Sequence, residues 1–130
     1  MKFTLKKIAI SFLIVVSAIV NSETKKEEKE IMNFGMQVVM TAQPGKGNEL
    51  ASIMLKASEL VSKMKGCKIY IVQVALDDSD KILITEVWES REDQQASLVN
   101  PEVRDLITTA KPIIVNMEYV QANTVGGKGL

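Results

Sequence analysis

The sequence contains no histidine and only one cysteine, and both absences exclude classes of site. Without histidine the chain cannot build a Ser-His-Asp triad, an imidazole-bound zinc site or a haem held by a proximal histidine. The lone Cys67 has no partner for an internal disulfide and no histidine to act as its base. We therefore interpret Cys67 as a small buried apolar side chain, and we predict no metal site.

A basic and then apolar N-terminus precedes the domain. Lys2, Lys6 and Lys7 lie before an apolar run at residues 8–20, which is shorter than the roughly 20 residues of a membrane span. This pattern predicts a signal peptide at residues 1–22, with an uncleaved membrane anchor as the alternative. We expect an exported protein, either periplasmic or secreted. The mixed-charge segment 23–30 has no apolar residue and is typical of a solvated linker.

Basic residues are few in the rest of the chain. Beyond the predicted signal, 13 basic and 16 acidic side chains remain, which gives a net charge of −3. The two arginines, Arg91 and Arg104, are not part of a basic cluster. Because phosphate binding needs clustered Lys and Arg, we exclude nucleic acid as a partner. The glycine-rich residues 123–130 come at the end with no helix after them, and we predict a flexible tail there.

The spacing of apolar residues predicts alternating strands and helices between residues 31 and 122. Period-two patterns indicate strands at 32–41, 68–76, 82–88 and 113–122, and helical spacing indicates helices at 50–64 and 100–110. Ser90 can cap a further short helix, and Asn100 followed by Pro101 is a typical helix start. The order β-α-β-β-α-β predicts an α+β fold of the ferredoxin-like kind, with an antiparallel sheet covered by helices on one face.

Both faces of this sheet carry apolar side chains. The helices can cover only one face, and a bare apolar face of roughly several hundred Å² is unusual on a monomer. We therefore predict a homodimer that pairs through its sheets. We place Met36 and Met117 on the interface face.

Four short segments resemble the antibiotic biosynthesis monooxygenase domain family. They are Thr85-Glu86-Val87-Trp88-Glu89-Ser90-Arg91-Glu92, Pro44-Gly45-Lys46, Gly66-Cys67 and Asn100-Pro101. The resemblance extends over residues 31–122 and implies a dimeric α+β barrel with a pocket between sheet and helices. Its members include cofactor-free oxygenases that act on phenols and quinols, haem-degrading enzymes and small-molecule isomerases. The tryptophan at position 88 commonly lines the pocket of such proteins.

Two positions depart from the family pattern. Many members have a histidine where this chain has Ser97, and a second histidine where it has Glu102. The haem-degrading branch is therefore disfavoured, and we expect no cofactor. A cofactor-free oxygenase acts on an electron-rich substrate that reacts with oxygen once it is deprotonated. The base must then be a carboxylate, a tyrosine or a water held by an amide.

The candidate site follows from strand parity and from this resemblance. Glu86 and Trp88 share one strand face, which makes Glu86 a candidate base and Trp88 a candidate stacking surface for an aromatic ring. A sheet-rim ion pair for Glu86 and a core position for Trp88 are the alternatives. Asn33 and Gln37 are candidate substrate-binding amides unless they face solvent or the dimer, and Ser97 is a candidate by its family position.

Two functions are consistent with these residues. The first is a cofactor-independent monooxygenase that acts on a small phenolic or quinol-like molecule. The second is a non-catalytic exported domain that binds a hydrophobic small molecule on the same fold.

Overall fold

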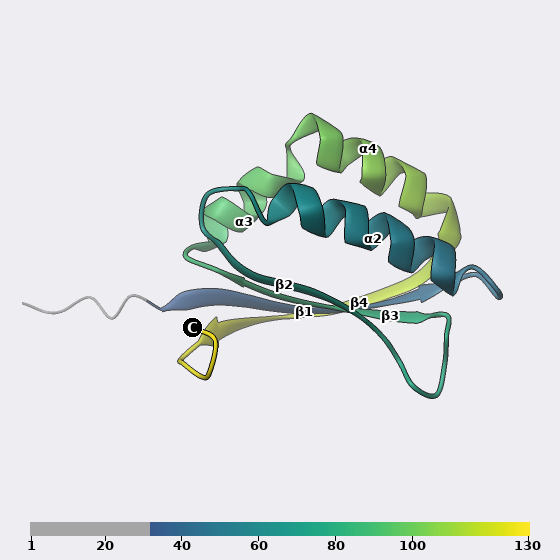
Figure 1. Cartoon of the computed structure of the whole chain (residues 1–130), viewed down its shortest axis with the longest axis horizontal. Coiled ribbons are helices and arrows are strands. Elements are labelled where there is room, and N and C mark those ends of the chain that lie inside the picture. The colour runs from purple at the N-terminus through teal and green to yellow at the C-terminus, as the bar shows by residue number, and fades with distance from the viewer. Residues whose placement is uncertain (1–31) are drawn as a thin grey trace, which may run out of the picture. The chain divides into compact units, whose positions relative to one another are not determined.

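The computed structural model describes residues 32–130 (Figure 1). The predicted signal peptide at 1–22 and the linker at 23–30 lie outside the described residues. Among the described helices, none is long and apolar enough to cross a membrane.

The described chain forms a four-stranded antiparallel sheet in the order β2-β3-β1-β4. Figure 1 shows the helices gathered on one side of this sheet. The predicted ferredoxin-like α+β fold is confirmed. In chain order its elements are β1 (Asn33–Ala42), α2 (Gly47–Val61), β2 (Cys67–Val74), β3 (Lys81–Trp88), α3 (Arg91–Leu98), α4 (Pro101–Ala110), the 3₁₀ turn η1 (Lys111–Ile113) and β4 (Ile114–Thr124).

The predicted helix starts are confirmed in detail. The Ser90 hydroxyl accepts a hydrogen bond from the Asp93 backbone N–H at 3.1 Å, which caps α3. The Asn100 side chain accepts hydrogen bonds from the backbone N–H groups of Glu102 and Val103, which caps α4. Both caps provide hydrogen-bond acceptors for backbone N–H groups in the first turn of the helix.

The ends of α2 and β4 are among those that differ from the prediction. Helix α2 ends at Val61 rather than Met64, and the chain then turns to reach Gly66, which has a φ of 82°. Strand β4 continues to Thr124, two residues past the predicted end of the domain, because Asn123 and Thr124 pair with the start of β1.

The strand register arranges side chains in rows across the helix-covered face. Tyr70, Glu86, Met36 and Gln121 are successive partners on β2, β3, β1 and β4. A neighbouring row contains Cys67, Trp88, Phe34 and Asn123. Residues directly opposite in a sheet point to the same side, so each row faces the helices. The fully buried Ile82 and Ile84 continue this face of β3 into the core.

This register corrects the predicted face of two methionines. Met36 and Met117 lie on the helix-covered face, since they share parity with Val38 and Met40 of the core. The opposite face, here called the open face, has no helix over it and carries polar side chains, such as Gln37, Thr85 and Glu118, between larger apolar ones. The larger apolar ones are Ile69, Ile71, Leu83, Val87, Val39 and Val120. The prediction failed because both parities of these strands are apolar.

Candidate functional site

A cavity of about 440 Å³ lies between the helix-covered face of the sheet and helices α2, α3 and α4. Its walls are largely apolar, with contributions from Met36, Val38, Met54, Val61, Val103 and Ile107. A few polar side chains also line this inner cavity: Tyr70, Glu86, Gln94, Gln95, Ser97, Lys111, Tyr119 and Gln121. A largely apolar hollow of this size with few polar groups is typical of a small-molecule site.

Glu86 is the one carboxyl group that lines this cavity within the described chain. Its side chain is only 8% exposed, and its Oε2 accepts a hydrogen bond of 2.9 Å from the Trp88 indole N–H. Among residues 32–130 the single ion pair joins Lys46 to Glu49, so no described cation neutralises Glu86. Burial raises the pKa of Glu86, and the hydrogen bond from Trp88 opposes that rise. A carboxyl group in this setting can exchange a proton at higher pH than an exposed one.

Two further titratable groups surround Glu86. Burial raises the pKa of the Tyr70 hydroxyl, and the neighbouring Glu86 raises it further. The same two causes, in the same order, raise the pKa of the Cys67 thiol. Tyr70 and Cys67 therefore stay neutral at neutral pH, which leaves Glu86 as the group able to take up a proton.

Helix α3 adds polar groups to the cavity wall. Ser97 is 4% exposed, and its hydroxyl donates a hydrogen bond of 2.6 Å to the Gln94 carbonyl. Gln94 is 5% exposed, and it lines the inner cavity. A side-chain amide at the cavity wall can donate to or accept from a ligand there.

The structure brings together only part of the predicted site. Glu86 and Ser97 line the inner cavity, but Trp88 is fully buried behind Glu86 and is absent from the cavity wall. Asn33 and Gln37 lie on the open face, because their parity is opposite to that of Met36. Gln37 accepts a hydrogen bond from the Thr85 hydroxyl there at 2.9 Å. A single chain therefore cannot present these amides and Glu86 to one small ligand.

Tyr70 and Gln94 are site residues that the sequence analysis did not identify. The hairpin that joins β2 and β3 has its turn centred near Asp78, and this position pairs Tyr70 with Glu86. The predicted turn could therefore have identified Tyr70 as the neighbour of Glu86. Gln94 precedes Ser97 by three residues, and this spacing puts both on one side of a helix. Both residues could have been found from the predicted elements.

The raised pKa of Glu86 predicts a pH-dependent stability. The folded state holds this proton more tightly than the unfolded chain, whose pKa is about 4.3. Glu86 therefore contributes its full stability below pH ~4.3, and this contribution is lost as the pH rises through the folded pKa. Glu86→Gln cannot ionise, so its free energy of unfolding relative to that of the wild type should increase between pH 4 and pH 8.

Urea unfolding at both pH values measures this difference. Glu102→Gln is the matched control, because Glu102 is exposed and does not line the inner cavity. A constant difference between Glu86→Gln and the wild type would contradict the burial of the Glu86 charge.

Sequence and structure comparisons place the chain among known proteins. The family model for antibiotic biosynthesis monooxygenase matches residues 33–109. The chain belongs to this family. The resemblance seen in the four short segments is thereby confirmed. No curated protein matched the chain.

Solved structures of similar proteins have the same fold. A protein from Chloroflexus aurantiacus J-10-fl assigned to the antibiotic biosynthesis monooxygenases is 38% identical, with a TM-score of 0.68 over 73% of this chain and 95% of its own. One so assigned from Deinococcus radiodurans is 18% identical, with a TM-score of 0.65 over 72% and 94% of the two chains. A mutant of SnoaB, a cofactor-independent oxygenase from Streptomyces nogalater, is 12% identical, with a TM-score of 0.65 over 74% and 96%.

Proposed function

We propose that this member of the antibiotic biosynthesis monooxygenase family is a cofactor-independent monooxygenase for a small phenolic or quinol-like molecule. The main support for this function is the position of Glu86, a buried carboxyl group in the wall of an otherwise largely apolar cavity. An aromatic ring gains free energy by burial in such a cavity, at about 25 cal/mol per Å² of apolar surface. The ring's hydroxyl group then has one acceptor with a raised pKa, which suits a general base.

The chemistry needs only the substrate, dioxygen and a base. Glu86 removes the phenolic proton, and the electron-rich phenolate ring donates electrons to O₂. A C–O bond forms at a ring carbon that carries hydrogen, which gives a hydroperoxide after protonation. Cleavage of the O–O bond with loss of that ring hydrogen releases water and leaves a new C=O group. One oxygen atom enters the product and the other becomes water, and the substrate supplies all four electrons and the two protons of that water.

The surrounding residues support this role for Glu86. The Trp88 indole N–H holds Oε2 at 2.9 Å, so the carboxyl group is oriented before the substrate arrives. The Gln94 amide and the Ser97 hydroxyl on the facing helix are positioned to orient a substrate oxygen. SnoaB, which shares the fold, is itself a cofactor-independent oxygenase.

A binding domain without catalysis is the second candidate. It is favoured by Ser97 and Glu102, which stand where many family members are expected to have histidine. Oxygen uptake with a panel of naphthols and quinols, in the presence of EDTA and without added cofactor, tests the two functions. The monooxygenase should consume oxygen in a saturable way, above the rate with heat-inactivated protein. Binding by calorimetry without any such uptake would instead establish the binding domain.

We also propose that the protein acts as a homodimer that pairs through the open face. This face carries apolar side chains on all four strands, including Leu83 and Val39, which are paired at its centre. No helix of the described chain covers it, and Ile71 and Val120 are 48% and 65% exposed. Burial of this surface against a second copy removes it from water.

A charge on the open face should therefore separate the subunits. We expect the wild type to have twice the mass of one chain by light scattering and Leu83→Asp to be a monomer, because burial of an unpaired carboxylate is strongly unfavourable. Leu55→Asp is the matched control on helix α2, where Leu55 is 53% exposed. Circular dichroism checks that both variants are folded. A wild type that is monomeric at micromolar concentration would rule out the dimer.

A further inference from the structure

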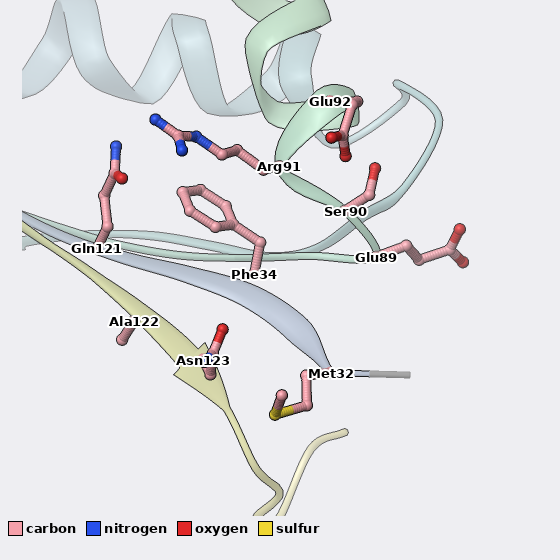
Figure 2. A pocket seen from close by; sticks show the side chains of 9 residues that line it. All are labelled: Met32, Phe34, Glu89, Ser90, Arg91, Glu92, Gln121, Ala122 and Asn123. Atoms are coloured by element: carbon pink, nitrogen blue, oxygen red, sulfur yellow. The ribbon is translucent and has the colours of Figure 1, made fainter. Parts of the chain in front are cut away.

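A second hollow of about 420 Å³ opens beside the inner cavity, where β1 begins and β4 ends (Figure 2). Phe34 forms its floor, Arg91 at the start of α3 borders it, and Gln121 and Asn123 contribute amides from β4. This outer hollow differs from the inner cavity in its chemistry, since polar and charged side chains form most of its wall.

The positive and negative side chains around the outer hollow point in different directions. Figure 2 shows the Arg91 side chain extending over the Phe34 ring toward Gln121, whereas the Glu89 and Glu92 side chains, which also line the hollow, point away from Arg91. Neither carboxylate forms an ion pair with Arg91, since the single ion pair of the described residues joins Lys46 to Glu49. The guanidinium therefore faces the hollow without a described anionic partner.

The outer hollow adjoins the proposed catalytic site. Gln121 lines both hollows, and it belongs to the same row across the sheet as Met36 and Glu86. Two strand spacings separate Gln121 from Glu86, which is about 10 Å between their backbones. Helix α3 spans both hollows as well, because Arg91 borders the outer one and Gln94 lines the inner one a turn later. The backbone separation between Glu86 and Gln121 is thus comparable to the length of a two-ring ligand.

We propose that the outer hollow binds a carboxylate carried by the aromatic ligand, with Arg91 as its partner. This inference rests on the proposed function and narrows its substrate class to phenols that bear an acidic group remote from the reacting hydroxyl. The planar guanidinium can pair with both carboxylate oxygens, and the amides of Gln121 and Asn123 offer further donors. The Phe34 ring can pack against the aromatic part of the same ligand.

Calorimetric titration with a matched pair of ligands tests the proposal. 2-Naphthol and 6-hydroxy-2-naphthoate share the two-ring phenol, but only the second has a carboxylate at the far end. The wild type should bind the naphthoate about five- to tenfold more tightly, and added salt should reduce this preference because the site is open to solvent. Arg91→Gln should remove the preference and leave the affinity for 2-naphthol unchanged.

Two control variants sharpen the result. Arg104→Gln should keep the preference, because Arg104 is exposed on α4 and lines neither hollow. Lys111 lines the inner cavity, so loss of the preference in Lys111→Gln but not in Arg91→Gln would overturn the role of Arg91. Equal binding of both ligands by the wild type would overturn the inference and leave the proposed function intact. Failure to bind either naphthalene would overturn both.

Discussion

Replacing Glu86 with glutamine is expected to lower oxygen uptake with a phenolic substrate by about 10²-fold or more, with little change in ligand affinity. Glutamine has nearly the same shape, and its side-chain oxygen can still accept the hydrogen bond from the Trp88 indole N–H. It cannot take up the phenolic proton at neutral pH. The loss should therefore fall on kcat, while the dissociation constant measured by calorimetry stays within about twofold.

The matched control is Glu102→Gln, which removes an exposed carboxylate on α4 and should leave turnover unchanged. A substrate with a more acidic hydroxyl should also lose less activity in Glu86→Gln, because it needs the base less. Full turnover by Glu86→Gln would show that another group or solvent removes the proton.

Truncation of Trp88 to alanine is expected to lower the free energy of unfolding by about 3–5 kcal/mol. Trp88 is fully buried and packs with Val61 and Val103, so its removal leaves a cavity and releases the Glu86 side chain. Leu55→Ala on the outer side of α2 is the control and should cost far less, since Leu55 is 53% exposed. Urea unfolding measures both values.

A second variant separates the two roles of Trp88. Trp88→Phe keeps most of the buried ring but removes the N–H group that stabilises the Glu86 carboxylate. The pKa of Glu86 should then rise further, and the acidic limb of the kcat/KM profile should move to higher pH. An unchanged profile in a stable Trp88→Phe would mean that the hydrogen bond does not tune the base.

The order of elements was predictable because the local signals agree with one another. The caps at Ser90 and Asn100 and the alternation in β1 each pointed to the element that the structure contains. The face of β1 was not predictable from the same pattern. Both Met36 and Val39 are apolar, and only the pairing of Met36 with Glu86 and of Val39 with Leu83 on β3 decides which parity meets the helices.

The candidate site was predictable to a similar degree. Period two placed Glu86 and Trp88 on one face, and the structure keeps them together. Their roles depend on how deeply each side chain is buried, which the local sequence does not determine. Trp88 is fully buried, whereas Glu86 lines the cavity. Gln37 was a candidate for the substrate site but lies on the open face, which was the alternative for it. The sequence did not reveal this because both parities of β1 contain apolar residues, which is also why Met36 was assigned to the wrong face. The outer hollow could not be foreseen, because it combines the start of β1, the start of α3 and the end of β4.

We propose that the protein inserts one atom of dioxygen into a phenol bound at Glu86. Mass spectrometry of the product formed under ¹⁸O₂, with EDTA present and no added cofactor, measures this directly. We expect the quinone product to contain one ¹⁸O atom in its new carbonyl group, and Glu86→Gln to form about 10²-fold less of it. Unlabelled product, or labelled product formed equally by Glu86→Gln and by heat-inactivated protein, would contradict the claim.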